Sequence, residues 1–350
     1  MNQLSISVPN PIQPEQLNSL LSAAGQGPVL ITTHNSPDPD ALASGLALAK
    51  LLKESSGIPS RLVYSGLVSR AENRAVLRLL TPEWEYSDAL HDIGAYSAVA
   101  LIDSQPGAGN NSLPVDFLPD IVIDHHTPVR PETQQARFRD IRIGIGSTAS
   151  ILFQYLNAAD VAVDSRLATA LFYGLRADTN GLARDATTAD GVIYSLLLSH
   201  LDSSLLHQVI LSGLSQQYFS AFESGLRSAK ITGQTITTYL GEIYRPDLVA
   251  EMADLLVRLE NVNTALCLGW YDGSIFLSLR TGTPNEDAGL LLQDIITGHG
   301  KAGGHGTIAG GQIPLNGQDA DELVQQVTGR FLEVMGETAS SIPLLPEKDC

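Results

Sequence analysis

Short, mostly apolar runs alternate with stretches of helical periodicity in the first half of the chain. The runs have the length of buried strands and cover residues 29–33, 61–64, 98–102 and 121–123. Apolar positions at helical spacing predict helices over residues 41–54, 149–157 and 166–175, and Ser147 and Thr148 are N-cap candidates for the second of them. This alternation predicts an α/β fold built on a parallel sheet.

The pattern changes in the second half of the chain. Residues 189–230 have a helical pattern that Gly213 interrupts, and strand-like runs at 235–239 and 274–279 flank an amphipathic helix over 246–259. We therefore expect a helical linker followed by a smaller α/β domain. The expected boundaries are residues 1–212 for the first domain, 213–231 for the linker, 232–338 for the second domain and 339–350 for a frayed tail.

Composition and charge narrow the class of partner. The chain has 350 residues and 43% hydrophobic content, which is enough to form a core in each of two domains. Its net charge of -17 opposes the binding of long nucleic acid through phosphates, so we expect a short anionic substrate. Two cysteines provide neither a disulfide framework nor a cysteine-based metal site. Because no basic leader and no run of about 18 apolar residues is seen, we expect a cytoplasmic protein without a membrane partner.

Acids and histidines gather in four clusters along the first half of the chain. These are His34-x3-Asp38-x-Asp40, then Asp103, then Asp124-His125-His126, and then Asp178. Three of the clusters follow predicted strands, and the carboxyl ends of parallel strands meet at one edge of a sheet. Aspartate and histidine are ligands of divalent cations, and a two-ion site needs about this many.

Each cluster alone also has an ordinary structural interpretation. Asp38 or Asp40, beside prolines, could form a turn and cap the helix that begins at Ala41. Asp103 could end a strand in a turn, and Asp178 could end a helix. Two carboxylates two residues apart repel each other unless a cation neutralises them, so the joint occurrence favours a metal site.

These motifs resemble those of the DHH phosphoesterase family, in the same order. The likeness is to members with a C-terminal DHH-associated (DHHA1) domain, the oligoribonuclease (nanoRNase) and pAp phosphatase group. The second half of the chain carries a matching signature, Ser278-Leu279-Arg280 followed by Gly303-Gly304-His305 and Gly310-Gly311. The resemblance implies a parallel-sheet DHH domain joined by a helical linker to the smaller domain.

The resemblance also implies a role for each residue of the motifs. It assigns His34, Asp38, Asp103 and Asp178 to one manganese ion and Asp40, Asp103 and His125 to a second, with Asp103 as the bridge. Asp124 and His126 would orient ligands or move protons, as catalytic residues. Magnesium is the alternative ion, and the histidines favour manganese. In the second domain, the implied substrate-binding residues are Arg280, Lys301, Gly303, Gly304 and His305.

The glycine-rich segment 299–311 has two interpretations on residue types alone. Six of its thirteen residues are glycine, which allows backbone N–H groups to close on an oxyanion. It could equally be a flexible connection between a strand and a helix. The resemblance favours the anion-binding interpretation, in a cleft between the domains that would select short substrates.

We therefore predict a manganese-dependent phosphodiesterase or phosphatase, a hydrolase acting on short oligoribonucleotides or 3',5'-bisphosphorylated nucleosides (pAp). Three alternatives stay open. They are hydrolysis of cyclic dinucleotides or their linear products, hydrolysis of polyphosphate or pyrophosphate, and nucleotide sensing without turnover. The sequence leaves the oligomeric state open, a homodimer included.

Overall fold

A computed structural model describes residues 9, 11–90, 92–282 and 287–346 of the chain. The described residues form two compact units, and the division falls between residues 212 and 213. None of the helices in the described ranges is long and apolar enough to cross a membrane.

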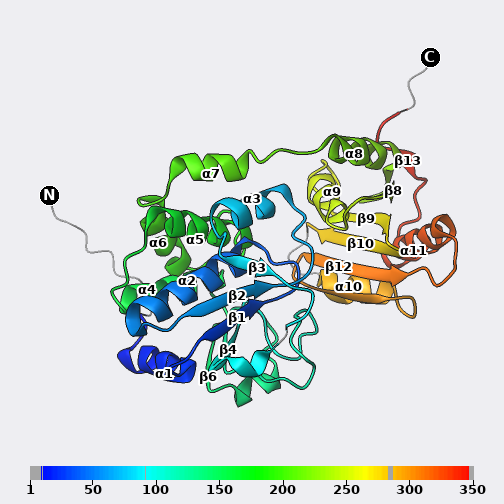
Figure 1. The fold of residues 1–350 in the computed structure, drawn as a ribbon. Coiled ribbons are helices and arrows are strands. Elements are labelled where there is room, and N and C mark those ends of the chain that lie inside the picture. Colours follow the sequence, from blue (N-terminus) through cyan, green and yellow to red (C-terminus); the bar gives the residue numbers. More distant parts are fainter. Residues whose placement is uncertain (1–8, 10, 91, 283–286, 347–350) are drawn as a thin grey trace. The chain divides into compact units, whose positions relative to one another are not determined.

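The first unit is built on a parallel sheet whose strand order is β3-β2-β1-β4-β5-β6 (Figure 1). The strands are β1 (Val29–Thr33), β2 (Ser60–Tyr64), β3 (Trp84–Tyr86), β4 (Ala98–Ile102), β5 (Ile121–Asp124) and β6 (Phe138–Ile141). The chain runs outward from β1 in one direction as far as β3 and then returns to β4 on the other side of β1. At such a switch point, an open α/β sheet leaves a crevice at the carboxyl ends of its strands.

The two faces of this sheet are covered differently. Val29 and Ile31 of β1 pack into a large core with the helices, whereas Leu30 packs with Val99 and Leu101 on the opposite face. Loop residues between the strands complete that smaller cluster. The helices are α1 (Pro14–Ala24), α2 (Pro39–Ser56), α3 (Ala71–Leu79), α4 (Thr148–Ala158), α5 (Ser165–Asp178), α6 (Thr188–Leu198) and α7 (Ser203–Ile210).

The second unit is built on a mixed sheet whose strand order is β11-β12-β10-β9-β8-β7-β13. Its strands are β7 (Lys230–Thr232), β8 (Thr235–Glu242), β9 (Thr264–Tyr271), β10 (Ser274–Thr281), β11 (Lys301–His305), β12 (Ile308–Pro314) and β13 (Ile342–Pro343). Helices cover both faces, with α8 (Gln216–Ser228) and α9 (Leu248–Leu256) on one and α10 (Ala288–Ile295) and α11 (Ala320–Val334) on the other. Each face of the sheet has its own hydrophobic core, and successive residues of β9 point into one core or the other. Ala265 and Cys267 pack with α8 and α9, whereas Leu266 and Leu268 pack with α10 and α11.

The predicted α/β class, with a parallel sheet first and a smaller α/β unit after it, is confirmed. The structure excludes one open interpretation and corrects one expectation. The glycine-rich segment is not an irregular connection, because residues 301–305 and 308–314 are the antiparallel strands β11 and β12. A Cβ on Gly304 would collide with the carbonyl oxygen of Ile308, so glycine lets the two strands approach. The expected frayed tail is paired at residues 342–343, where β13 adds to β7.

Candidate metal centre

Two histidines present a ring nitrogen to the same group of carboxylates. Nδ1 of His34 donates to the carbonyl oxygen of Asn35 at 3.0 Å, and Nδ1 of His125 donates to that of Ile145 at 3.2 Å. These bonds orient each ring so that, in its neutral form, Nε2 carries the lone pair, as in metal-binding histidines. Nε2 of His34 lies 3.6 Å from Oδ2 of Asp103, and Nε2 of His125 lies 3.6 Å from its Oδ1. Both Nε2 atoms therefore face one carboxylate.

Asp103 occupies a special backbone position at the end of β4. Its φ of 57° lies in the left-handed region, which costs a non-glycine residue free energy and is retained mainly at functional sites. The side chain is buried, and Oδ2 makes no hydrogen bond within the described residues. Nε2 of His125 also lacks one, although it lies 3.1 Å from Oδ2 of Asp178, without the alignment that a hydrogen bond needs. Such buried, unsatisfied ligand atoms fit a site for a cation.

The N-terminus of α4 holds two of the predicted ligands in place. Both oxygens of the fully buried Asp40 accept backbone N–H groups, Oδ2 from Thr148 and Oδ1 from Ala149, each at 2.7 Å. The Thr148 hydroxyl donates to Oδ1 of Asp103 at 2.7 Å. A helix N-terminus stabilises carboxylates through its unpaired N–H groups and its dipole. The predicted N-cap, Ser147, accepts from the N–H of Ser150 and begins this helix.

Asp38 fits both interpretations of its motif, the helix cap and the metal ligand. Its Oδ1 caps α2 by accepting the N–H of Ala41 at 3.0 Å, as the structural interpretation predicted. Its Oδ2 makes no hydrogen bond among the described residues, and Asp38 lies with His34 and Asp103 in one group of potential ligands. The cap therefore orients the carboxylate and leaves an oxygen for a cation.

Without a cation, the pKa values of Asp38, Asp40 and His34 are raised, so these groups bind protons more tightly than usual. Burial and the charges of Asp178 and Asp103 raise the pKa of Asp38 to about 6, and burial followed by the same kind of repulsion raises the pKa of Asp40 well above its ordinary value. Burial opposes the charged form of His34, but Asp103 and Asp38 outweigh it and raise its pKa to about 9. A divalent cation supplies the positive charge that these protons otherwise provide, so the residues fit such an ion.

The structure groups the predicted ligands slightly differently from the expected division. His34, Asp38 and Asp103 form one group whose ligand atoms lie within 4.8 Å of one another, as expected. Asp178, at the C-terminus of α5, groups instead with Asp40 and His125. A third group of potential ligands is Asp103, His125 and His126. Asp103 and His125 thus each belong to two groups.

Asp124 and His126 form a pair beside this cluster. Nδ1 of His126 donates to Oδ1 of the buried Asp124 at 2.8 Å. Oδ2 of Asp124 accepts from the Gln105 side chain at 2.7 Å, and the same amide donates to the His126 carbonyl oxygen at 2.9 Å. Burial lowers the pKa of His126, but Asp124 and Asp103 outweigh it and raise the pKa overall, which favours a protonated ring.

Some residues that support the cluster were not predicted. Gln105 carries no sequence signal, because a single amide in a loop fits many roles. Asp190 is fully buried and accepts hydrogen bonds from Gly146, Ser150 and Thr187, which fixes the turn before α4. A Thr187-x2-Asp190 capping box could have placed the start of α6, but not this contact with a segment 44 residues away.

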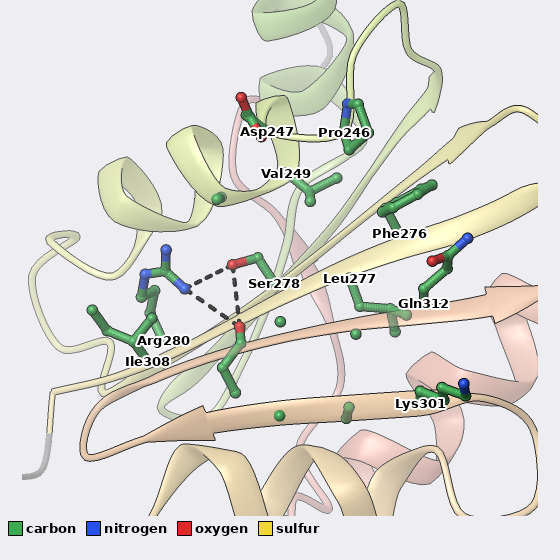
Figure 2. Close-up of a pocket in the computed structure, with 16 residues that line it drawn as sticks. Pro246, Asp247, Val249, Phe276, Leu277, Ser278, Arg280, Lys301, Ile308 and Gln312 are labelled. Carbon is green, nitrogen blue, oxygen red and sulfur yellow. Dashed lines mark hydrogen bonds between the residues drawn. The ribbon is translucent and has the colours of Figure 1, made fainter. Parts of the chain in front are cut away.

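Three of the five predicted substrate-binding residues of the second unit line a cavity of about 510 Å³ (Figure 2). Arg280, Lys301 and Gly303 line it, together with the N-terminal turn of α9 and the glycines of β12. Much of the Arg280 guanidinium is already engaged in hydrogen bonds within the protein, because Nε donates to Asp254 at 2.5 Å and Nη1 to Ser278 at 2.7 Å. Gly304 lies on β11 outside the lining, and the side chain of His305 lies outside the described part.

Comparison with known proteins agrees with this architecture. The chain matches the "DHH family, N-terminal domain" over residues 28–175 and the "DHHA1 domain" over residues 232–333. The chain belongs to the DHH phosphoesterase family and carries both of these domains.

Several proteins are similar over much of their length. An uncharacterized protein of Methanocaldococcus jannaschii is 33% identical over 322 residues, which cover 89% of this chain and 65% of that protein. The bifunctional oligoribonuclease and PAP phosphatase NrnA of Thermus thermophilus is 25% identical over 87% of this chain and 89% of its own. A probable manganese-dependent inorganic pyrophosphatase of Streptococcus agalactiae is 24% identical over 68% of this chain and 76% of its own.

A solved structure has the same fold. An exopolyphosphatase-related protein from Bacteroides fragilis superposes with a TM-score of 0.72 over 91% of this chain and 95% of its own, at 16% identity. At that identity, the likeness concerns the fold alone.

Proposed function

We propose that this protein is a two-metal-ion phosphoesterase that hydrolyses short oligoribonucleotides and 3',5'-bisphosphorylated nucleosides, with manganese as its ion. The observation that carries the proposal is Asp103, a buried carboxylate in a left-handed backbone position that the Nε2 atoms of two histidines face. The similarity to the Thermus NrnA, which spans most of both chains, supports the substrate class.

Six side chains would hold the ions. His34, Asp38 and Asp103 form one set, and Asp40, His125 and Asp178 form the other, with Asp103 near both because it lies 3.6 Å from His125. When bound, divalent ions supply charge neutralisation for phosphate oxygens and an activated water at neutral pH. Manganese accepts both carboxylate and imidazole ligands, and the name of the Streptococcus relative agrees with that choice.

His126 has the features of a proton donor for the leaving oxygen. Asp124 fixes its ring through Nδ1, which leaves Nε2 as the second N–H of the protonated ring. The neighbouring carboxylates raise the pKa of His126 and so favour that protonated form. A group so held can protonate an ester oxygen as the phosphorus–oxygen bond breaks.

The cavity of the second unit would bind a phosphate or sugar remote from the bond that breaks. Nη2 of Arg280, on β10, makes no hydrogen bond among the described residues. Lys301 is exposed on the edge strand β11. Gly303 and Gly310 present backbone without side chains to the same cavity. These groups recognise an anion of nucleotide size, which favours nucleotide substrates over inorganic ones.

Inorganic pyrophosphate is the second candidate substrate. The 24% identity to the Streptococcus pyrophosphatase favours it. The residues that line the proposed nucleotide-binding cavity lie within the DHHA1 match, residues 232–333. This favours a nucleotide substrate over pyrophosphate.

A substrate comparison tests the proposal. Purified protein with manganese is given a dinucleotide, pAp, a cyclic dinucleotide, pyrophosphate and tripolyphosphate, and products are separated by ion-exchange chromatography. We expect mononucleotides from the dinucleotide and AMP from pAp. Turnover of the cyclic dinucleotide alone, of the inorganic substrates alone, or binding without product would each reject the proposed substrate class.

A variant tests the metal centre separately. Asp103→Asn keeps a residue that tolerates the left-handed conformation but removes the charge, and we expect no detectable turnover and no stabilisation by manganese. Asp116→Asn, at an exposed position in the same connection between β4 and β5, is the matched control. Full activity of a folded Asp103→Asn protein would overturn the metal assignment.

A further inference from the structure

The first unit also has a cavity, which plays no part in the chemistry described so far. It has a volume of about 590 Å³, which is within the range of small-molecule sites. The residues that line it include Tyr64, Leu67, Val68, Arg74, Arg78 and Tyr86. They come from the end of β2 and the loop after it, from α3 and from β3, so three neighbouring elements form its walls.

One wall of this cavity offers aromatic surface. The rings of Tyr64 and Tyr86 meet edge to face, with centroids 5.6 Å apart. Tyr86 is 55% exposed and Leu67 is 51% exposed, which is unusual for large apolar side chains that face a hollow. A planar ring in the cavity would cover these groups, and nucleobases stack on tyrosine in this way.

The other wall carries positive charge without a counter-charge. Arg74 and Arg78 are four residues apart on α3, so they lie on the same side of the helix and repel each other. Within the described ranges neither forms an ion pair, although the chain as a whole has a net charge of -17. Nη1 of Arg74 donates to the carbonyl oxygen of Ser69, which holds that side chain across the loop. An anion between the two guanidinium groups would relieve the repulsion.

The cavity is attached to the loop that carries His34 and Asp38. Ser36, between them, donates its N–H to Ser65 at 2.8 Å, and its hydroxyl accepts the N–H of Leu67 at 3.1 Å. A Cβ on Gly66 would lie 2.6 Å from the backbone nitrogen of Ser36, so only glycine allows this approach. Because Ser36 is two residues from each ligand, about 7 Å of extended chain at most, the cavity wall and the metal centre are neighbours.

We propose that this cavity binds one nucleotide unit of the substrate, with the base against Tyr64 and Tyr86 and a phosphate between Arg74 and Arg78. The inference rests on the proposed function, which it deepens by adding a subsite on the first unit. It predicts a preference for substrates that have a nucleotide on either side of the bond that is hydrolysed. A substrate of the inorganic kind would leave the aromatic wall uncovered.

Two substitutions remove the proposed contacts without touching the metal ligands. Arg78→Ala removes a guanidinium that makes no hydrogen bond or ion pair among the described residues, and Tyr86→Ala removes an exposed ring. Tyr86→Phe is the conservative variant that keeps the ring. Arg139→Ala, an exposed arginine of β6 with no ion pair in the described part of the chain, is the control for general loss of charge.

The measurements are KM and kcat for a dinucleotide with manganese, and its equilibrium Kd in EDTA by calorimetry. We expect Arg78→Ala and Tyr86→Ala to raise KM and Kd between about 5-fold and 100-fold, the range for loss of one stacked base, with kcat within about 2-fold. Tyr86→Phe and Arg139→Ala should stay within about 2-fold of the wild type.

An unchanged Kd in both Arg78→Ala and Tyr86→Ala would overturn the subsite, and so would an equal effect of Arg139→Ala. Failure of the proposed function would look different, because the wild type itself would then hydrolyse no nucleotide. The Kd values in EDTA need no turnover, so they decide on the cavity in that case as well.

Discussion

Thr148 donates its hydroxyl to Asp103 at 2.7 Å, so the first residue of α4 directly holds the central carboxylate of the candidate metal centre. Its backbone N–H holds Asp40 at the same distance. Thr148 binds no cation in this arrangement. It fixes the direction in which two predicted ligands present their remaining lone pairs, and such supporting contacts are commonly as important as the ligands.

The substitution Thr148→Val therefore tests this support. Valine keeps the shape and the backbone bond to Asp40 but cannot donate to Asp103, so we expect manganese affinity or kcat to fall about 10-fold to 100-fold. Calorimetric titration and steady-state kinetics measure the two effects. Thr281→Val is the control, because the buried Thr281 hydroxyl makes no hydrogen bond within the described residues. Equal values for both variants would show that the contact has no such role.

Substitution of His126 should separate proton transfer from metal binding. We expect His126→Asn to lower kcat about 10²-fold to 10⁴-fold for a nucleotide substrate, the usual contribution of a general acid. The loss should be much smaller for a p-nitrophenyl ester, whose leaving group needs no proton. His125→Asn should instead weaken manganese binding. A loss that is the same for both kinds of leaving group would exclude His126 as the proton donor.

Metal binding should release protons and strengthen as pH rises. In the metal-free protein, His34 with a pKa of about 9 is protonated at pH 7, and an ion must displace that proton. The apparent Kd for manganese should therefore decrease between about pH 6 and pH 9, and below about pH 6 protonation of Asp38 should weaken binding further. Calorimetry in two buffers of different ionisation enthalpy counts the protons. A Kd that is independent of pH would contradict the protonated metal-free state.

Substitution of Gly45 should destabilise the protein on packing grounds. A Cβ at this position in α2 would collide with the ring of Trp84, whose Nε1 donates to the carbonyl oxygen of Leu42 at 2.9 Å and which is therefore fixed. Overpacking costs about 1–3 kcal/mol, whereas alanine in a helix gains up to about 1 kcal/mol over glycine. We expect Gly45→Ala to lower the free energy of unfolding by about 1–2 kcal/mol.

Chemical denaturation measures this change, with Gly191→Ala as the control. Gly191 lies in α6, and an added Cβ there would meet no atom within 4 Å. That variant should be neutral or slightly more stable than the wild type. A Gly45→Ala protein of higher stability than the wild type would show that Trp84 can move aside at little cost.

The sequence predicted the elements that depend on local pattern. The strand ending before His34 and the helix capped by Asp38 follow from apolar runs, a proline-rich turn and helical spacing, which are visible within about twenty residues. The order of strands and clusters then placed the acids at one sheet edge. Thr148 was recognised as part of a helix start, but not as a partner of Asp103.

What the sequence did not predict depends on contacts between distant segments. Asp103 and Thr148 are 45 residues apart, and no periodicity links them. Many glycines normally indicate a loop, but at Gly304 they allow two strands to lie side by side. The burial of Arg280 in a bond to Asp254 follows from the packing of α9 against β10, which composition cannot show.

The order of strands in the first sheet also determines when the protein can first capture an ion during folding. A chain that has formed only β1 and α2 contains Asp38 and Asp40 but has not yet brought Asp103 beside them, and Asp178 arrives only with the last turn of α5. Nascent or partly unfolded molecules therefore lack the complete set of donors. Tight binding of the proposed ion would therefore require that the whole first unit has assembled, and unfinished chains would not compete for the metal.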